Sequence, residues 1–430
     1  MFGRRIPGLW HEGDFVRLWA AATVSMLGSF ITRSALPFTA ILVLGAGAPE
    51  VALIRGAELV AGLTLGLVAG AWIDRRRRRP VMVAADLGRA VLLGSIPLAA
   101  LGGVLGLPQL VIVAFGAAVL TTFFDVADRA FLPTVVGRDR LVSANSTLTA
   151  SGSAAEFIGF GAGGWLIQLL TAPIAIALDA VSFVVSAVLL GRIRTHEPAV
   201  IVPDGGHEPI LDEIREGLRL TFRDPILRPL ALGDAAVAAF WGVFGATYFV
   251  FATQLGFSPG VIGLVAAVGG ASSFIGALAV NRGVRRLGVG RFLVAALVVV
   301  ATGNLAIAFA PDASIVGLAF LLVQQLLSDS ALTAFDVVAV SIRQTTVDDR
   351  ALGRVGASMH VLSLAAMLVG TIVGGIVAAT ISVRAAIFVG GAGGFVAVAV
   401  VWFSRVRTLR DMPLPPALPI RAGVDVRLGE

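Results

Sequence analysis

Several acidic residues interrupt apolar runs that are otherwise long enough to span a bilayer, and four of them are candidates for carrying a proton: Glu58, Glu156, Asp234 and Asp329. An ionisable side chain inside a bilayer is costly, and it marks a proton or substrate pathway unless it is merely paired. From Ser143, thirteen residues at about 1.5 Å each place the Glu156 carboxylate about 20 Å into the membrane. A buried carboxylate that faces two aqueous sides in turn can load and release a proton. We therefore predict Glu156 as the carrier of a coupling proton and the other three as rivals. The alternative for each is a hydrogen bond that holds two helices together.

Two further charges accompany these acids in the first two apolar runs. Arg33 lies in the outer half of the first run, and Arg55 lies one i, i+3 step before Glu58 in the second. This grouping predicts either a structural ion cluster or a contact with substrate or proton.

The sequence lacks the residues of the common catalytic and cofactor sites. There is no cysteine and no lysine, which excludes thiolate metal sites and the phosphate-binding Gly-x-x-x-x-Gly-Lys-Ser/Thr loop. The four histidines are scattered without metal-ligand spacing, and no Ser, His and Asp set is present. We therefore expect no enzyme activity, no cofactor, no metal and no direct use of ATP.

Composition places the chain in a membrane. Apolar residues make up 57% and charged residues 14% of the 430, and the mean hydropathy is +0.92. The formal net charge of +6 does not indicate binding to nucleic acid. The arginines stand between apolar runs, so they indicate the orientation of the chain in the membrane. The lipid bilayer is the expected partner.

Twelve apolar runs of spanning length are present, six on each side of a polar interval. We expect an N-terminal bundle in residues 1–192, a cytoplasmic linker in 193–225, a C-terminal bundle in 226–405 and a tail in 406–430. In the linker, Leu211, Ile214, Leu218 and Phe222 fall on one face, which predicts an amphipathic interfacial helix.

The distribution of arginine predicts the orientation. When the connections are assigned to alternate sides, only Arg33, Arg55 and Arg384 of the 33 arginines fall away from one side. That side is the cytoplasmic one, because basic residues are retained there. No signal peptide is evident before Gly13, so both termini are expected in the cytoplasm.

The two halves repeat at an offset of about 210 residues. FVRLWA at Phe15 matches ILRPLA at Ile226, and FFDVAD at Phe123 matches AFDVVA at Ala334. Glycines of the fifth run repeat in the eleventh, and the expected close helix packing involves Gly159, Gly163, Gly164, Gly370, Gly374 and Gly375. This register indicates an internal duplication.

One loop carries a family resemblance. The pattern Gly70-x-x-x-Asp74-Arg75-x-x-Arg78-Arg79 resembles the signature between the second and third helices of the major facilitator superfamily. The resemblance implies an all-α membrane protein with twelve transmembrane helices in two pseudo-symmetric six-helix bundles and a central substrate cavity. It also implies a cytoplasmic gate, in which Asp74 pairs with Arg78 and with Asp125 or Asp128 while Arg75 completes the basic loop. The alternative is that the arginines only fix topology.

Within that superfamily the chain resembles bacterial exporters of macrolides and of enterobactin-type siderophores, through EGDFVRLWAAATVSMLGSF, FFDVADRAFLPTVV, LVSANSTL and LDAVSFVVSAVLL. The resemblance implies proton-coupled efflux of small amphipathic or hydrophobic compounds by a monomer in the bacterial inner membrane. An importer, a lipid flippase and a membrane sensor that binds without transport remain alternatives.

The same resemblance places four helices around the cavity. They supply an aromatic surface suited to apolar cargo. The candidates are Phe30, Phe123, Phe124, Trp241, Phe244, Tyr248 and Phe335, with Arg33 beside them. A packing role is the alternative for each.

Overall fold

The computed structural model describes residues 9–73, 75–197 and 210–413. This part of the chain forms thirteen α-helices and no strand. The first half contains α1 (Gly13–Leu44), α2 (Ala48–Ile73), α3 (Arg78–Leu101), α4 (Leu107–Val136), α5 (Leu141–Leu170) and α6 (Ala172–Gly191). The linker contains α7 (Ile210–Arg223). The second half contains α8 (Leu227–Gln254), α9 (Pro259–Leu287), α10 (Val289–Ala306), α11 (Ile315–Thr346), α12 (Asp349–Thr380) and α13 (Val383–Trp402).

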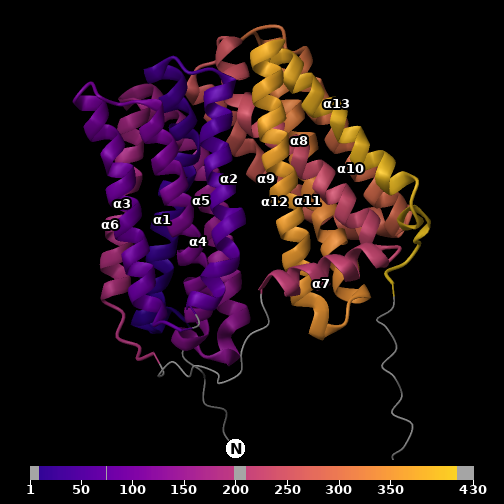
Figure 1. Cartoon of the computed structure of the whole chain (residues 1–430), viewed down its shortest axis with the longest axis horizontal. Helices are drawn as coiled ribbons and strands as arrows, with labels where there is room; N and C mark the ends of the chain where they lie inside the picture. Colours follow the sequence, from indigo (N-terminus) through magenta and orange to yellow (C-terminus); the bar gives the residue numbers. More distant parts are fainter. Residues whose placement is uncertain (1–8, 74, 198–209, 414–430) are drawn as a thin grey trace, which may run out of the picture.

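The six helices of each half form a separate bundle, and the two bundles lie side by side (Figure 1). In the first half, α1 packs on α5 and α6, α3 on α4 and α6, and α2 on α4. In the second half the equivalent pairs pack together: α8 with α12 and α13, α10 with α11 and α13, and α9 with α11. This common pairing is the structural form of the duplication seen in the sequence, and it confirms the predicted twelve-helix fold.

Ten of these helices are long and apolar enough to cross a membrane. The other two helices of the twelve in the bundles, α2 and α5, carry Arg55, Glu58 and Glu156. Both lie where the bundles meet, α2 against α12 and α5 against α9. Charged residues are tolerated there because they face protein or a cavity instead of lipid.

The repeated glycines bring the helices close together in matching pairs. A Cβ on Gly159 would lie 2.6 Å from the Cβ of Phe30 in α1, and a Cβ on Gly370 would overlap with the carbonyl oxygen of Ala239 in α8. The second repeated pair makes equivalent contacts: Gly163 packs against α1 and Gly374 packs against α8. Small residues allow this approach, which maximises van der Waals contact in a lipid environment.

The third glycine pair joins the two bundles. Gly164 packs on the backbone of Gly263 in α9, and Gly375 packs on Ala52 in α2. Gly159 and Gly163, by contrast, contact α1 of their own half.

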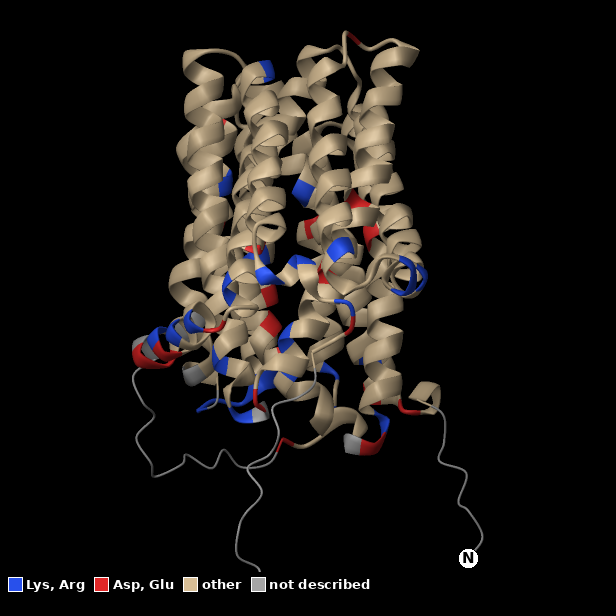
Figure 2. Ribbon diagram, turned by 90° about the vertical axis from the view of Figure 1, so that its right-hand side faces the viewer, with Lys and Arg blue, Asp and Glu red and all other residues tan. Residues whose placement is uncertain are grey.

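These contacts between the bundles lie at the end where α2 and α9 begin and α5 and α12 finish. At that end the backbone N–H of Gly260 also donates to the side-chain oxygen of Gln168 at 3.1 Å. We call the opposite end, which carries α7 and the α2–α3 turn, the linker end. Figure 1 shows the ribbons of the two halves diverging toward it, and Figure 2 shows the acidic and basic residues concentrated in that direction.

The linker helix α7 packs on the second bundle, mainly on α12. The Ser358 hydroxyl donates to the carbonyl of Ile214 at 3.0 Å, and Arg354 pairs with Glu216. Gly217 and Thr221 form the buried face. Phe222, predicted on the apolar face, is 39% exposed, because the contact face follows Gly217 and Thr221 instead.

A second repeated feature lies at the linker end. The first two backbone N–H groups of α3, on Arg78 and Arg79, donate to the carboxylate of Glu197 at 2.7 and 2.8 Å. At the equivalent place in the second half, the N–H groups of Val289 and Gly290 donate to the carbonyls of Arg410 and Leu409 at 3.1 and 2.9 Å. In both halves, therefore, the segment after the sixth helix satisfies the free N-terminal donors of the third helix.

We expect Gly370→Ala to lower stability by about 1–3 kcal/mol, the usual cost of overpacking, because the new methyl meets the Ala239 carbonyl oxygen in α8. Gly353→Ala is the matched control on the same helix, where an added Cβ has nothing within 4 Å. Thermal unfolding in detergent, followed by loss of the monodisperse peak in size-exclusion chromatography, measures both. Equal Tm values for the two variants would contradict the close packing of α8 and α12.

Candidate functional site

A cavity of about 860 Å³ lies between the two bundles. Both halves line it: α1, α2, α3, α4, α5 and α6 on one side, and α8, α9, α11 and α12 on the other. This volume is in the range of pockets that bind drug-sized molecules.

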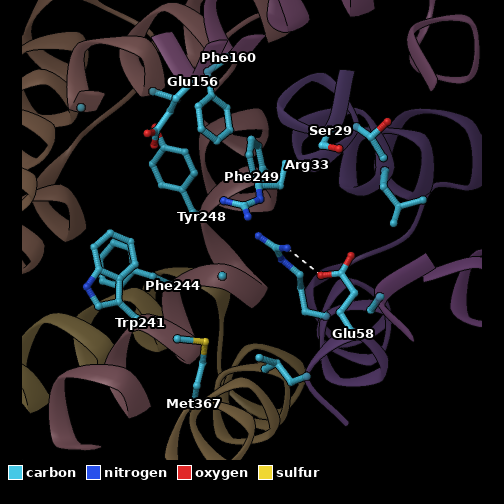
Figure 3. Close-up of a pocket in the computed structure, with 18 of the residues that line it drawn as sticks. Ser29, Arg33, Glu58, Glu156, Phe160, Trp241, Phe244, Tyr248, Phe249 and Met367 are labelled. Atoms are coloured by element: carbon cyan, nitrogen blue, oxygen red, sulfur yellow. Dashed lines mark hydrogen bonds and ion pairs between the residues drawn. The ribbon is translucent and has the colours of Figure 1, made fainter. Parts of the chain in front are cut away.

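The wall from the second half is mainly aromatic. Trp241, Phe244, Tyr248 and Phe249 project from successive turns of α8, and Met367 of α12 lies beside them (Figure 3). The rings of Trp241 and Phe244 are 6.3 Å apart, and those of Tyr248 and Phe249 are 5.4 Å apart. The Trp241 indole N–H and the Tyr248 hydroxyl have no hydrogen-bond partner among the described residues. This wall offers apolar faces together with two polar atoms.

The charged residues of the cavity are divided unequally between its walls. Every arginine of the lining comes from the first half: Arg33 from α1, Arg55 from α2 and Arg89 from α3. The second half contributes only Asp329 and Asp336, both from α11. Acids line both sides, because the first half also contributes Glu58, Glu156 and Asp179. The cavity therefore has all its cations on one side and its main aromatic wall on the other.

Three of the four predicted proton carriers line this cavity. Glu58 accepts from Arg55 at 2.8 Å, and Asp329 accepts from the side-chain amide of Gln325 at 2.6 Å. Glu156 lies beside the ring of Tyr248 (Figure 3) and lines the cavity together with Asp329. Asp234 does not line the cavity. It accepts from the Ser363 hydroxyl at 2.5 Å and so joins α8 to α12.

The predicted cavity aromatics are only partly brought together. Arg33, Trp241, Phe244 and Tyr248 line the cavity. Phe30 lies behind Phe160, at 5.4 Å between ring centroids. The other three predicted rings lie elsewhere: Phe335 is fully buried in the core of the second bundle, Phe124 is buried in the core of the first, and Phe123 packs on Trp72. Helical periodicity turns these rings inward within their own bundles.

Asp74 of the predicted gate lies outside the described residues. Among the described residues, no ion pair joins Arg75 or Arg78 to Asp125 or Asp128. The backbone N–H of Arg78 instead bonds to Glu197, as described above.

The sequence analysis did not identify an ion pair inside the first bundle, between Asp86 and Arg89. Asp86 and Arg89 pair one helical turn apart on α3, and both are buried, with Asp86 at 0% exposure. The Arg89 guanidinium also stacks on Phe183 of α6 at 4.1 Å and on Phe124 of α4 at 4.6 Å. Asp179 of α6 lies nearby and accepts from Ser182 at 3.0 Å. The i, i+3 spacing of opposite charges in an apolar run could have revealed this pair.

Three other cavity residues were also not predicted from the sequence as cavity residues: Asp336, Phe160 and Phe249. Asp336 was found only as the repeat of Asp125, and Phe160 and Phe249 were not singled out. Their positions along the helices do not show which side faces the cavity until the neighbouring helices are known.

The geometry defines the class of protein. Two duplicated six-helix bundles that enclose a central cavity with ionisable residues from both halves are the architecture of a secondary transporter, and not of an enzyme.

Comparison with known proteins gives the family. The sequence pattern of the Major Facilitator Superfamily matches residues 18–351, and the chain belongs to this superfamily. It is therefore a multi-pass membrane protein.

Individual relatives agree with this assignment. The chain is 29% identical to the multidrug efflux pump Tap of Mycolicibacterium fortuitum over 232 residues, which are 52% of this chain and 56% of Tap. The alignment therefore spans about half the length of this curated relative.

Among solved structures, the nucleoside transporter NupG superposes with a TM-score of 0.76 at 10% identity, covering 90% of this chain and 98% of NupG. A bacterial homologue of the iron transporter ferroportin, in an inward-facing state, superposes with a TM-score of 0.71 at 19% identity, covering 90% and 98%. At these identities the structures show a common fold.

We expect Arg89→Gln to destabilise the protein by about 3–5 kcal/mol, because it leaves the Asp86 carboxylate buried without its partner. The double variant Asp86→Asn with Arg89→Gln removes both charges and should regain most of this loss. Thermal unfolding in detergent provides the comparison. Arg55→Gln is the control, since its partner Glu58 remains 28% exposed to the cavity and should tolerate the change. A double variant as unstable as the single one would argue against a buried pair.

Proposed function

We propose that this protein exports small amphipathic or hydrophobic compounds across the bacterial inner membrane in exchange for protons. The observation that carries the proposal is the cavity between the halves, which combines an aromatic wall with carboxylates from both bundles. The efflux pump among its relatives supports the direction of transport.

The aromatic wall suits the proposed cargo. Trp241, Phe244 and Phe249 give large apolar contact area, and the free polar atoms of Trp241 and Tyr248 can orient a bound molecule. A flexible Met367 beside them can adapt to cargoes of different shape.

The contacts between the bundles support alternating access. The glycine contacts of α5 with α9 and of α2 with α12 hold the bundles together at the end opposite the linker. Loss of these contacts, with closure at the linker end, would expose the cavity to the other side by rocking of two rigid bundles. We assign the linker end to the cytoplasm, because the arginine-rich turns lie there.

Glu156 and Asp329 are the best placed pair for proton coupling. One belongs to α5 of the first bundle and the other to α11 of the second, and both line the same cavity. Rocking of the bundles changes their separation and their exposure to water, and so changes the affinity of the pair for a proton. Of the two, we assign the proton to Glu156, because Asp329 already accepts a hydrogen bond from Gln325 in its own helix.

We expect Glu156→Gln to abolish proton-driven efflux and to preserve exchange of substrate against substrate. Glutamine keeps most of the hydrogen bonding of the side chain and removes its titration. Proteoliposomes with an imposed pH gradient measure the first process with a fluorescent hydrophobic dye, and gradient-free counterflow measures the second. Glu213→Gln, an exposed change on α7, is the matched control and should behave as wild type.

The outcomes separate the alternatives. Undiminished proton-driven efflux by Glu156→Gln would exclude Glu156 as the carrier, and the same test on Asp329→Asn would then examine its neighbour. Dye entry in place of efflux would indicate an importer, movement of labelled lipid would indicate a flippase, and binding without flux would indicate a sensor.

A further inference from the structure

Two arginines of the first bundle, Arg33 of α1 and Arg55 of α2, line the cavity. The Arg33 side chain points toward the ion pair that Glu58 makes with Arg55 (Figure 3). Two like charges of the same bundle therefore face one cavity.

Only one of the two guanidiniums is paired with a carboxylate among the described residues. Arg55 pairs with Glu58 at 2.8 Å, whereas Arg33 forms no ion pair among the described residues. The Arg33 guanidinium carbon lies 5.3 Å from the centre of the Phe30 ring. Arg33 is nevertheless exposed to the cavity, so its donors can reach a bound molecule.

This arrangement favours an anion. Two like charges repel more strongly in a low-dielectric site than in water, and an anionic group placed between them converts the repulsion into attraction. A guanidinium presents parallel N–H donors that match a carboxylate, sulfonate or phosphate bidentately. The other arginine of the lining, Arg89, does not compete, because it is buried against Asp86.

The rest of the cavity limits what the anion can belong to. The aromatic rings of α8 form the wall contributed by the other half, and that half contributes no cation to the lining. A small inorganic anion would leave the apolar wall uncovered. A molecule with an anionic group at one end and an aromatic or aliphatic body at the other satisfies both walls.

We propose that Arg33 and Arg55 form an anion-binding subsite that selects amphipathic organic anions, with the apolar body of the cargo held against Trp241 and Phe244. This inference rests on the proposed transport function, because it names the class of cargo that the same cavity binds. It does not depend on the direction of transport or on the coupling ion.

Binding of 2-naphthoate and 2-naphthamide to the full-length protein in lipid nanodiscs tests the subsite by calorimetry. The two probes share one ring system and differ in the anionic group. The wild-type protein should bind the carboxylate more tightly, and Arg33→Gln should weaken naphthoate by about tenfold, the effect of losing one charge-assisted hydrogen bond. Naphthamide binding should change little. Arg285→Gln removes a positive charge from the exposed end of α9 and is the matched control.

A second variant moves binding in the opposite direction. Glu58→Gln frees Arg55 from its carboxylate, so it should tighten naphthoate binding and leave naphthamide unchanged. This test remains decisive if Arg33→Gln does not fold. Equal binding of the two probes to wild type, absence of binding by both at millimolar concentration, or equal weakening of both by Arg33→Gln would overturn the inference. A carboxylate preference in a protein that shows no efflux would instead refute the proposed function and leave the subsite standing.

Discussion

The cost of placing charge in a low-dielectric environment governs this structure. A bilayer offers no water to a lipid-facing guanidinium or carboxylate, so every charge within the bundles must be paired or face the cavity. Asp86 and Arg89 illustrate the first solution, since they are buried and bound to each other between α3, α4 and α6. Arg33, Glu156 and Asp336 illustrate the second, since they line the space between the bundles. The cavity is thus where the fold permits charges that have no partner, and the chemistry of transport is concentrated there.

Duplication supplies the frame around that cavity. The two halves make equivalent contacts with residues about 210 positions apart. Examples are the glycines of α5 and α12 and the N–H groups at the start of α3 and α10. The chemical solutions need not match: Glu197 provides a side-chain carboxylate where the second half uses the carbonyls of Leu409 and Arg410. Because backbone geometry is preserved while side chains diverge, the two halves can rock as similar rigid bodies and still present different walls.

That divergence gives the cavity its polarity. The first half contributes all three arginines of the lining and the second contributes two aspartates and the α8 aromatics. A symmetric pair of walls would bind cargo in either orientation, whereas this arrangement distinguishes the ends of a molecule. The same division places Glu156 and Asp329 in different bundles, so any motion between bundles alters their environment.

The sequence alone determined the class of fold, because its signals are local. Twelve apolar runs, arginine-rich turns such as Arg75–Arg79 and the repeat of Phe15 with Ile226 each report a property of a continuous segment in a membrane. The repeated glycines likewise identified which helices would approach closely. The expected division of the chain came from the same patterns, whereas Trp241, Phe244 and Tyr248 were identified as cavity candidates through the family resemblance.

The tertiary structure decided which side chains meet. Asp234 was equivalent to Asp329 in sequence, yet it bonds to Ser363 between α8 and α12 while Asp329 faces the cavity. Phe124 and Phe335 were equivalent to Trp241, yet both are buried within their own bundles. A helix in a membrane bundle is apolar on all faces, so periodicity cannot tell its cavity side from its core side. Only the rotation of each helix against its neighbours fixes that choice, and this rotation depends on contacts between residues that lie far apart in the chain.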